Sequence, residues 1–319
     1  MKKLLFLLTL TAAVSCNTPQ ELAVMTLNMR YDNPEDGMNN WRFRRERIAG
    51  LIRSEAVDLL GTQEVLANQF DDLQALLPGY RAIGVGREDG ARAGEFNAVV
   101  FRSDRFELLD SGVFRLSEEP ETPGSKGWDG ACERLATWTV LRDKSGRELL
   151  FINTHLDHVG EQARREGVAL LLRRIETLRD GRPVILTGDF NAEPDARESR
   201  KILHVRPETA LRNAPADPSA LYTPFVGLRR QGYGTLVYRD RRQLFDYILV
   251  SGAFASGNGL RYGGRCGIFV RDYLIHRSGP WKGYPIRTFQ AGRYTGGYSD
   301  HLPVFLDFEN KKPESPEVR

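Results

Sequence analysis

The stretch Pro183-Val-Ile-Leu-Thr-Gly-Asp-Phe-Asn191 joins a short apolar run to a polar turn. Residues 183–187 are aliphatic or β-branched and are bounded by Pro and Gly, which predicts a buried strand. Asp189 and Asn191 stand two positions apart, so both point to one side if the strand continues. The stretch therefore predicts a strand that delivers an acid and an amide to one edge of a sheet.

The same signals recur along the chain. Short apolar runs bounded by Gly, Pro or Asp predict further strands at 22–29, 58–62, 80–85, 97–101, 106–116, 136–141, 148–154, 244–250 and 303–308. Helical spacing of apolar residues predicts helices at 40–56, 67–77 and 161–178, with Asn39 or Asn40 as the cap of the first. No internal repeat or low-complexity linker interrupts residues 22–309. We therefore expect one large domain in which helices cover two packed sheets.

The composition is that of an ordinary globular protein. The 319 residues include 45 Lys and Arg and 42 Asp and Glu, for a net charge of +3, with 41% hydrophobic and 27% charged residues. These values exclude a disordered chain, a collagen-like repeat and a polytopic membrane protein. With three Cys in this length, the chain is not a disulfide-dense scaffold either.

The first residues resemble an export signal. Lys2 and Lys3 precede an apolar run at 4–10, and small residues then lead to Cys16. Cys16 stands where a bacterial lipoprotein signal carries its lipidated Cys, although Ala13 occupies a position that usually holds Leu. We expect a signal peptide at 1–15, a tether at 16–21 and a membrane-anchored lipoprotein, periplasmic or on the cell surface. Plain secretion is the alternative.

Two features remain open outside the predicted core. Cys132 and Cys266 could form a disulfide after export, or they could be two separate buried thiols, because sequence does not give their distance. The tail at 310–319 is polar and interrupted by Pro, which predicts disorder. No protein partner is evident.

Polar residues accompany the predicted strands. Alternation over residues 23–30 places Met25, Leu27 and Met29 on one face and Thr26, Asn28 and Arg30 on the other. An isolated carboxylate in an apolar strand, such as Asp246, needs a partner when buried, and a His is a suitable one.

One more polar group ends an apolar strand. In Phe151-Ile-Asn-Thr-His-Leu-Asp-His158, Asn153 and His155 share a face. An unbroken strand would turn His158 to the opposite face, which argues against a zinc His-x-x-His pair.

Taken together, these residues resemble a known superfamily. Its signature is matched by Asn28 in Thr-Leu-Asn-Met-Arg, Glu64 in Gln-Glu-Val, Asn-Thr-His155, Gly-Asp189-Phe-Asn191, Asp246-Tyr-Ile and Ser-Asp300-His301. This order is similar to that of the endonuclease/exonuclease/phosphatase superfamily, which has a DNase I-like fold and includes sphingomyelinases and inositol polyphosphate phosphatases. The resemblance covers about residues 22–308. It implies an α/β fold over residues 22–309, a four-layered sandwich of two packed, mainly antiparallel sheets flanked by helices.

The resemblance also implies a metal site. Glu64 matches the principal Mg²⁺ ligand of the superfamily, Asn28 lies next to the metal, and Asp300 is a second acidic residue on the metal side. Mg²⁺ prefers carboxylate and amide oxygens. We therefore expect Mg²⁺ as the cofactor, with Mn²⁺ as a substitute.

Five further residues match catalytic positions. By the resemblance, Asp189 positions or deprotonates the attacking water, and Asn191 orients the phosphate. His301 contacts the scissile phosphate, Asp246 holds His301, and His155 lies on the other side of the phosphate. A His held by a carboxylate is fixed in tautomer and stabilised as a cation.

Three residues are weaker candidates for binding phosphate or substrate. Arg30 is predicted to share the face of Asn28, where its guanidinium would suit a phosphate but offers no second metal ligand. Glu95 in Gly94-Glu-Phe-Asn97 and Arg134 in Cys132-Glu-Arg134 resemble segments near the site in secreted bacterial relatives. The alternative for both is a solvated loop.

The C-terminal half is basic. Residues 228–299 contain 12 Lys and Arg against three acidic residues, with many Gly and aromatic residues. We interpret this segment as a large loop insertion near the site, suited to nucleic acid or an anionic lipid surface. The alternative is a solvated surface that balances the acidic remainder.

These features lead to a functional hypothesis. We expect a Mg²⁺-dependent phosphoesterase that uses direct attack by water, because no nucleophilic Ser or Cys motif is present. Its substrate would be nucleic acid, a phospholipid or a small phosphoester, and both diesters and monoesters remain open. The alternatives are a catalytically inactive surface-anchored binding protein on the same fold and a zinc hydrolase, although the latter lacks the ligand spacing.

Overall fold

The structure is a computed structural model. It describes residues 22–195, 206–207, 217–238, 241–256, 260–279, 282–286 and 297–310. The predicted signal peptide at 1–15, the tether at 16–21 and all but the first residue of the tail at 310–319 lie outside the described residues. So do parts of the basic segment at 228–299.

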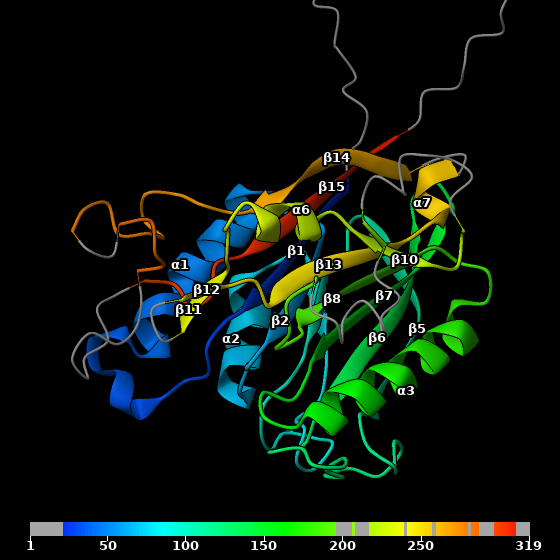
Figure 1. The fold of residues 1–319 in the computed structure, drawn as a ribbon, viewed down its shortest axis with the longest axis horizontal. Coiled ribbons are helices and arrows are strands. Elements are labelled where there is room, and N and C mark those ends of the chain that lie inside the picture. Colours follow the sequence, from blue (N-terminus) through cyan, green and yellow to red (C-terminus); the bar gives the residue numbers. More distant parts are fainter. Residues whose placement is uncertain are drawn as a thin grey trace, which may run out of the picture.

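Two mixed sheets form the centre of the fold (Figure 1). The first sheet contains, in spatial order, β14 (Leu260–Ile268), β15 (Val304–Asn310), β1 (Leu22–Asn28), β2 (Leu59–Gln63), β4 (Val99–Arg102) and β3 (Tyr80–Ile83). The second contains β5 (Phe106–Arg115), β6 (Leu135–Asp143), β7 (Glu148–His155), β8 (Val184–Asp189), β13 (Asp246–Ser251), β10 (Leu221–Thr223) and β9 (Arg206–Pro207). A separate hairpin joins β11 (Leu236–Tyr238) to β12 (Arg241–Gln243). Most neighbouring strands are antiparallel, and β1–β2, β7–β8 and β9–β10 are parallel.

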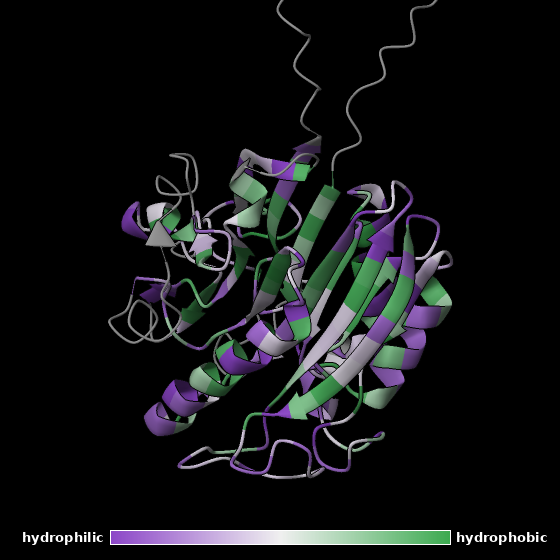
Figure 2. Ribbon diagram, turned by 90° about the vertical axis from the view of Figure 1, so that its right-hand side faces the viewer, coloured by the Kyte–Doolittle hydropathy of each residue, from purple (hydrophilic) through white to green (hydrophobic). Residues whose placement is uncertain are grey.

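Helices cover the outer faces of both sheets. The described helices are η1 (Pro34–Asn39), α1 (Trp41–Ser54), α2 (Ala67–Leu76), α3 (Glu161–Arg179), α6 (Phe225–Arg230) and α7 (Ala253–Ser256). In Figure 1, α3 lies on the opposite side of the sheets from α1 and α2. Figure 2 shows these helices banded in purple and green, as expected for amphipathic helices with one face on a sheet. The predicted four-layered sandwich is therefore confirmed.

The alternation predicted for β1 is also confirmed. Met25 and Leu27 belong to the apolar cluster that packs against α1 and α2, together with Ile48 and Ile52. Val24 belongs instead to the cluster between the two sheets. β1 therefore sends its even-numbered residues, up to Asn28, toward the second sheet.

All ten predicted strands and the three predicted helices are present. Asn40 caps α1 as expected, because its side chain accepts a hydrogen bond from the Arg42 N–H. The sequence reasoning missed β14, whose glycines interrupt the strand pattern. The pairing of β14 with β15 shifts register between Tyr262 and Arg265, where Gly263 and Gly264 lie.

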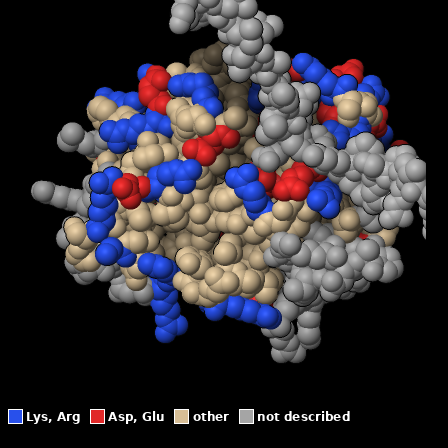
Figure 3. Space-filling view, turned by 90° about the horizontal axis from the view of Figure 1, so that it is seen from above, with Lys and Arg blue, Asp and Glu red and all other residues tan. Residues whose placement is uncertain are grey.

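The interpretation of residues 228–299 as one large loop needs correction. The described part of this segment contains β11, β12, β13, α7 and β14. Two arginines of β14 face acids of β15, at 3.4 Å for Arg265 and Asp307 and 3.6 Å for Arg261 and Glu309. Figure 3 shows blue and red side chains interspersed over the described part of the face seen from above. Part of the excess positive charge is therefore neutralised within the fold.

The structure bears on two further expectations, the disulfide between Cys132 and Cys266 and the exclusion of membrane-spanning helices. Cys132 and Cys266 are both half-buried thiols, and they are not joined in a disulfide. Cys132 Sγ lies near Asp157, whereas Cys266 Sγ accepts a hydrogen bond from the Tyr262 hydroxyl in β14. Within the described residues, no helix combines the length and the apolar character that crossing a membrane requires.

A buried amide joins the two sheets. The Asn153 side chain, on β7, donates to the carbonyl oxygens of Thr62 at 2.8 Å and Ala98 at 3.0 Å in the first sheet. Its oxygen accepts from Gln63 Nε2 at 2.7 Å and from Thr187 Oγ1 at 3.1 Å. Because the hydrogen-bonding groups of this amide are satisfied in a dry interior, it fixes how the sheets sit on each other.

A second buried polar group holds the loops at one end of the second sheet. The Asp157 carboxylate accepts hydrogen bonds from the backbone N–H groups of Gly160 at 2.7 Å, Val159 at 2.9 Å and Ala131 at 2.9 Å. It therefore ties the segment before α3 to the segment that leads into β6. Burial alone would raise the pKa of Asp157, but these N–H groups and the charge of Arg134 lower it below its usual value.

Replacement of Gly61 tests the contact between the sheets. A Cβ at this position would overlap Thr187 Oγ1 and lie 2.5 Å from Asn153 Oδ1. We expect Gly61→Ala to lower the free energy of unfolding by about 2 kcal/mol, as overpacked cores do. Gly50→Ala in α1 is the control, because its Cβ meets nothing within 4 Å, and it should raise stability by about 1 kcal/mol. Urea unfolding measures both, and equal effects of the two variants would contradict the prediction.

Replacement of Asp157 tests the loop anchor. A carboxylate with a lowered folded pKa stabilises the fold above its unfolded pKa of about 3.9 and loses this effect as pH falls through the folded pKa. Asp157→Asn should therefore cost about 2 kcal/mol at pH 7. The difference from the wild type should shrink below about pH 4. Unfolding curves from pH 3 to pH 7 measure it, and a difference that stays constant down to pH 3 would refute the anchor.

Candidate active site

Three strands of the second sheet place polar side chains in one row. Asp189 at the end of β8 pairs with His155 of β7 on one side and with Asp246 of β13 on the other. Neighbouring strands lie about 4.8 Å apart, so this register alone brings the three side chains to the same edge. All three residues are buried.

The first sheet brings an amide and a carboxylate to this row. Asn28 ends β1, and Glu64 follows β2 directly. Asn28 Nδ2 donates to Glu64 Oε1 at 2.8 Å and to Asp189 Oδ2 at 3.1 Å, so that one amide bridges carboxylates from the two sheets. Its oxygen accepts the Arg30 N–H at 3.0 Å. In this arrangement Asn28 orients two acids, and its role beside a metal stays a prediction.

His301 completes the row from the loop before β15. Its Nδ1 lies 2.7 Å from Asp246 Oδ2, the pairing that the isolated acid in β13 predicted. Ser299 Oγ accepts the His301 N–H at 3.2 Å and donates to the Asn28 carbonyl at 2.6 Å. Burial alone would lower the pKa of His301, but the charge and hydrogen bond of Asp246 raise it well above its usual value. This environment favours the protonated form of His301, and Nε2 is the ring nitrogen available to a substrate because Nδ1 is held by Asp246.

Asn191 reaches the site by a turn, not by continuation of the strand. β8 ends at Asp189, and Asn191 has a φ of 46°. Its amide nitrogen lies 3.1 Å from His155 Nε2 and donates to the Leu156 carbonyl at 2.9 Å. Burial, followed by the charge of Arg134, holds the pKa of His155 well below its usual value, so His155 is neutral.

Crowded carboxylates characterise the site. Burial and then the charge of Asp246 raise the pKa of Asp189 to about 6. Burial and then the charge of Asp300 raise the pKa of Glu64. Oxygen donors in such a group suit a hard divalent cation, which relieves their repulsion.

A second grouping at the site is also compatible with a metal. Ligand atoms of Asp189, Asp246 and His301 lie within 4.8 Å of one another. However, the 2.7 Å contact between His301 and Asp246 already uses two of these atoms in a hydrogen bond. The carboxylates of Glu64 and Asp300 are therefore the better donors for a cation.

Arg30 lies behind the site and not in the cavity. Its guanidinium binds both oxygens of the buried Asp36 at 2.7 Å and approaches Asp300 Oδ2 at 3.3 Å. Arg30 is absent from the cavity lining, so this arrangement does not support the predicted phosphate contact. Arg30 instead holds Asp300, the predicted metal-side residue.

The backbone is strained at the site. Arg30, Glu64 and Asn191 have φ values of 55°, 59° and 46°, in the left-handed region that costs a non-glycine residue about 1–3 kcal/mol. Each of these three residues follows the end of a strand by one or two positions. The left-handed turns give the side chains of these three residues directions that they would not have if the strands continued.

A cavity of about 480 Å³ opens over these groups. The predicted residues in its lining are Glu64, Glu95, Arg134, His155, Asp189, Asn191, Asp300 and His301. Sequence reasoning missed Tyr31, Arg87, Cys132, Leu236, Tyr238, Gln243 and Phe245 as members of this lining. Tyr238 and Gln243 come from the β11–β12 hairpin, which confirms that part of the basic segment lies near the site.

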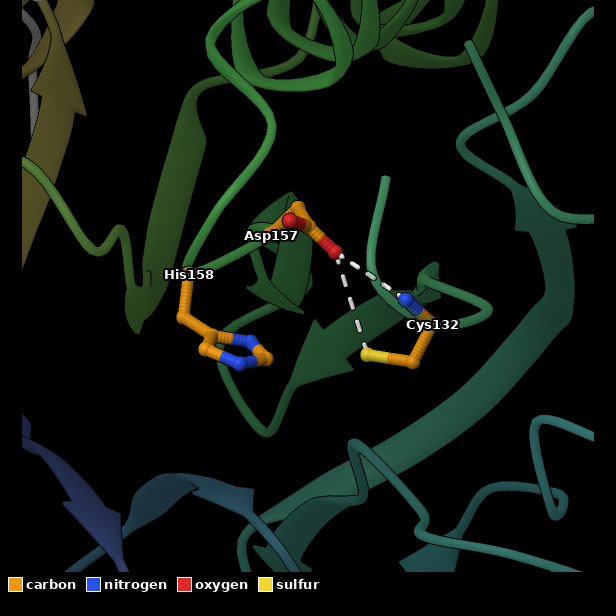
Figure 4. A group of neighbouring side chains, drawn as sticks. All are labelled: Cys132, Asp157 and His158. Atoms are coloured by element: carbon orange, nitrogen blue, oxygen red, sulfur yellow. Dashed lines mark hydrogen bonds between the residues drawn. The ribbon is translucent and has the colours of Figure 1, made fainter. Parts of the chain in front are cut away.

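His158 also lines the cavity, contrary to the expectation that it faces away from His155. The reason is that β7 ends at His155, so strand alternation does not extend to His158. Figure 4 shows the His158 imidazole with no hydrogen bond to Asp157 or Cys132, whereas Asp157 bonds to the Cys132 backbone and thiol. Although ligand atoms of the three lie within 4.8 Å, the Asp157 oxygens already accept several N–H groups. We therefore interpret this group as part of the loop anchor.

Comparisons with known proteins agree with this geometry. A family model described as the endonuclease/exonuclease/phosphatase family matches residues 144–310. The crystal structure of the endonuclease/exonuclease/phosphatase from Bacteroides vulgatus is 32% identical, with a TM-score of 0.69, and the match covers 91% of this chain and 99% of that one. A mannosyl-6-phosphatase from Bacteroides thetaiotaomicron is 29% identical, with a TM-score of 0.70 and coverage of 90% and 99%.

A curated relative is more distant. Protein angel of Drosophila melanogaster is 25% identical over 227 residues, which are 66% of this chain. The chain spans only 59% of the length of that relative. The family model and the close, nearly full-length match to the Bacteroides vulgatus structure together establish that the chain belongs to the endonuclease/exonuclease/phosphatase family.

Proposed function

We propose that the protein is a divalent-cation-dependent phosphoesterase in which water attacks phosphorus directly. One observation carries this proposal. Asn28 bridges Glu64 and Asp189, so a carboxylate suited to a cation and a carboxylate suited to a base are held at one point. The His301–Asp246 pair lies beside them and supplies a positive charge for the phosphoryl oxygens.

The residues present suit a divalent cation. Glu64 and Asp300 both line the cavity, and the charge of Asp300 helps to raise the pKa of Glu64, so the two acids lie close enough to repel each other. They would hold the ion, while Asn28 and Arg30 orient them. A bound Mg²⁺ or Mn²⁺ neutralises charge on the phosphoryl group.

The reaction consumes one water for each ester. The water oxygen forms a bond to phosphorus while the bond between phosphorus and the ester oxygen breaks. Asp189 takes one proton from the water and then returns it to the solvent, and the released alkoxide takes a proton from solvent water to become an alcohol. Asn191 is held by its hydrogen bonds to His155 and Leu156, and its backbone N–H donates to Asp189 Oδ1 at 3.0 Å, so it positions the base. His301 balances negative charge beside the attacked phosphorus.

The relatives support the reaction class. The family takes its name from nucleases and phosphatases, and the Bacteroides thetaiotaomicron relative is named a mannosyl-6-phosphatase. The alternative, a binding protein that has lost catalysis, is less well supported, because each of the catalytic positions carries a residue able to perform its role.

Replacement of Asp189 tests the reaction. We expect hydrolysis of p-nitrophenyl esters of phosphate to require Mg²⁺ or Mn²⁺ and to stop in EDTA. Asp189→Asn should lower kcat by about 1,000-fold through loss of the base. Asp58→Asn is the control, since Asp58 is as buried but lies at the other end of the first sheet, where Arg105 binds it. Full activity of folded Asp189→Asn, checked by thermal melting, would refute the proposal.

We also propose that the chain is exported and anchored through a lipid on Cys16. The motif at residues 1–16 supports this proposal. Cys16→Ser should move the protein from the membrane fraction to the soluble fraction of the producing bacterium and abolish incorporation of labelled palmitate. Cys132→Ser, which changes a half-buried thiol of the fold, should leave both unchanged. Retention of Cys16→Ser in the membrane would contradict the anchor.

A further inference from the structure

We propose that Arg134 makes this protein selective for phosphomonoesters over phosphodiesters, by binding the phosphoryl oxygen that only a monoester leaves free. This inference rests on the proposed function and adds to it the class of ester that the site accepts. It concerns the part of the cavity lining that carries Arg134, Arg87 and His158, beside Glu95.

Arg134 is a buried cation that has no hydrogen-bonded carboxylate within the described part of the chain, although Asp157 and Glu95 lie near enough for its charge to act on them. It is 6% exposed, and its Nη2 lies 3.1 Å from His158 Nδ1, an imidazole nitrogen and not a carboxylate. The nearest carboxylate oxygen among the described residues is Asp157 Oδ2, at 3.8 Å from Nε. Asp157 already accepts three or more backbone N–H groups, and Arg134 Nε has no hydrogen-bond partner among the residues that the structure describes.

The other arginines at the site differ in having a hydrogen-bonded carboxylate, although Arg87 Nε, like Arg134 Nε, has no hydrogen-bond partner among the described residues. Arg87 Nη1 binds Glu95 Oε2 at 2.7 Å, and Arg30 binds both oxygens of Asp36 at 2.7 Å. Their charges are each compensated by a hydrogen-bonded carboxylate. Removing a guanidinium from water without such a partner costs free energy of solvation. An anionic ligand in the cavity would offset this cost.

The register of the second sheet places Arg134 beside the reacting groups. Arg134 directly precedes β6, in which Ala136 pairs with Thr154, the residue before His155. His155 in turn pairs with Asp189. Arg134 therefore lies about two strand spacings, roughly 10 Å, from Asp189 along the edge. A phosphoryl group attacked from the Asp189 side fits between them, next to His155.

The chemistry of the two ester classes then decides the preference. A phosphomonoester presents three non-bridging oxygens and up to two negative charges, whereas a phosphodiester presents two such oxygens and one charge. A cation held by Glu64 and Asp300 would neutralise the charge of one oxygen, and His301 Nε2 could bind a second. The third oxygen of a monoester would meet Arg134, whose planar fork suits it. In a diester an alkoxy group takes that place and leaves the guanidinium unpaired.

Two esters with the same leaving group test this inference. p-Nitrophenyl phosphate and methyl p-nitrophenyl phosphate differ by one methyl group on the phosphoryl oxygen. With Mg²⁺ present, we expect the wild type to favour the monoester in kcat/KM. Arg134→Met should lower kcat/KM for the monoester by about 100-fold, the value of a charged hydrogen bond, and change the diester by less than about threefold.

Arg115→Met is the matched control. Arg115 is as buried as Arg134, at 7% exposed, and pairs with Leu135 on the neighbouring strand, but it does not line the cavity. Arg115→Met should leave the ratio of the kcat/KM values for the monoester and the diester unchanged. Arg134→Lys, which keeps the charge without the planar fork, should restore part of the monoester activity. Inhibition by inorganic phosphate gives a second measurement, and its inhibition constant should rise about 100-fold in Arg134→Met.

The outcomes separate the two proposals. A wild type that hydrolyses neither ester with Mg²⁺ or Mn²⁺ would overturn the proposed function and the inference together. A wild type that prefers the diester, or an Arg134→Met variant that loses both activities equally while phosphate inhibits as before, would overturn the inference alone. If Arg134→Met does not fold, Arg134→Lys decides, since an unchanged ratio and an unchanged phosphate inhibition constant in that variant would overturn the inference.

Discussion

Two buried amides hold the sheets together, and the active site depends on both. Asn153 links β7 to the carbonyl oxygens of β2 and its neighbour in the core, where no water competes. Asn28 makes the corresponding link at the edge, between Glu64 of one sheet and Asp189 of the other. Because Gln63, which binds Asn153, directly precedes Glu64, the core contact also sets the position of the edge contact. A shift of one sheet against the other would separate the two carboxylates.

This construction gathers charge at the cost of stability. Burial, followed by the like charge of neighbouring acids, raises the pKa values of Asp189 and Glu64, and Glu64 is itself one of three left-handed residues at the site. The fold compensates with groups that do not touch the cavity. Asp36 neutralises Arg30, and Arg30 in turn holds Asp300. The segment from Arg30 to Asp36 therefore serves in part to support Asp300, the predicted metal-side carboxylate.

Strand periodicity explains what sequence reasoning could predict. His155 and Asp189 follow apolar runs, so the apolar pattern predicts that they lie at an edge of the sheet. Asp246 was expected inside the strand at 244–250, and in the structure it is the first residue of β13. The metal-side residues came from resemblance, and their geometry was not foreseeable. Arg30, Asn191 and His158 lie just beyond strand ends, where alternation no longer holds. Arg87 and Tyr238 come from turns and a hairpin whose position depends on contacts distant in sequence, so no local pattern indicated them.

The cavity has two walls, and this division explains why the residues that match the family motifs do not indicate which substrate is bound. The signature residues that line the cavity lie directly after β2, at the end of β7, at or just beyond the end of β8, or in the loop before β15, and they serve bond cleavage in any phosphoester. The other wall comes from the segments before β4 and β6 and from the β11–β12 hairpin, which carry Arg87, Arg134 and Tyr238. Connections of this kind tolerate sequence change better than paired strands do. Substrate choice can therefore diverge on the second wall while the chemistry on the first stays the same.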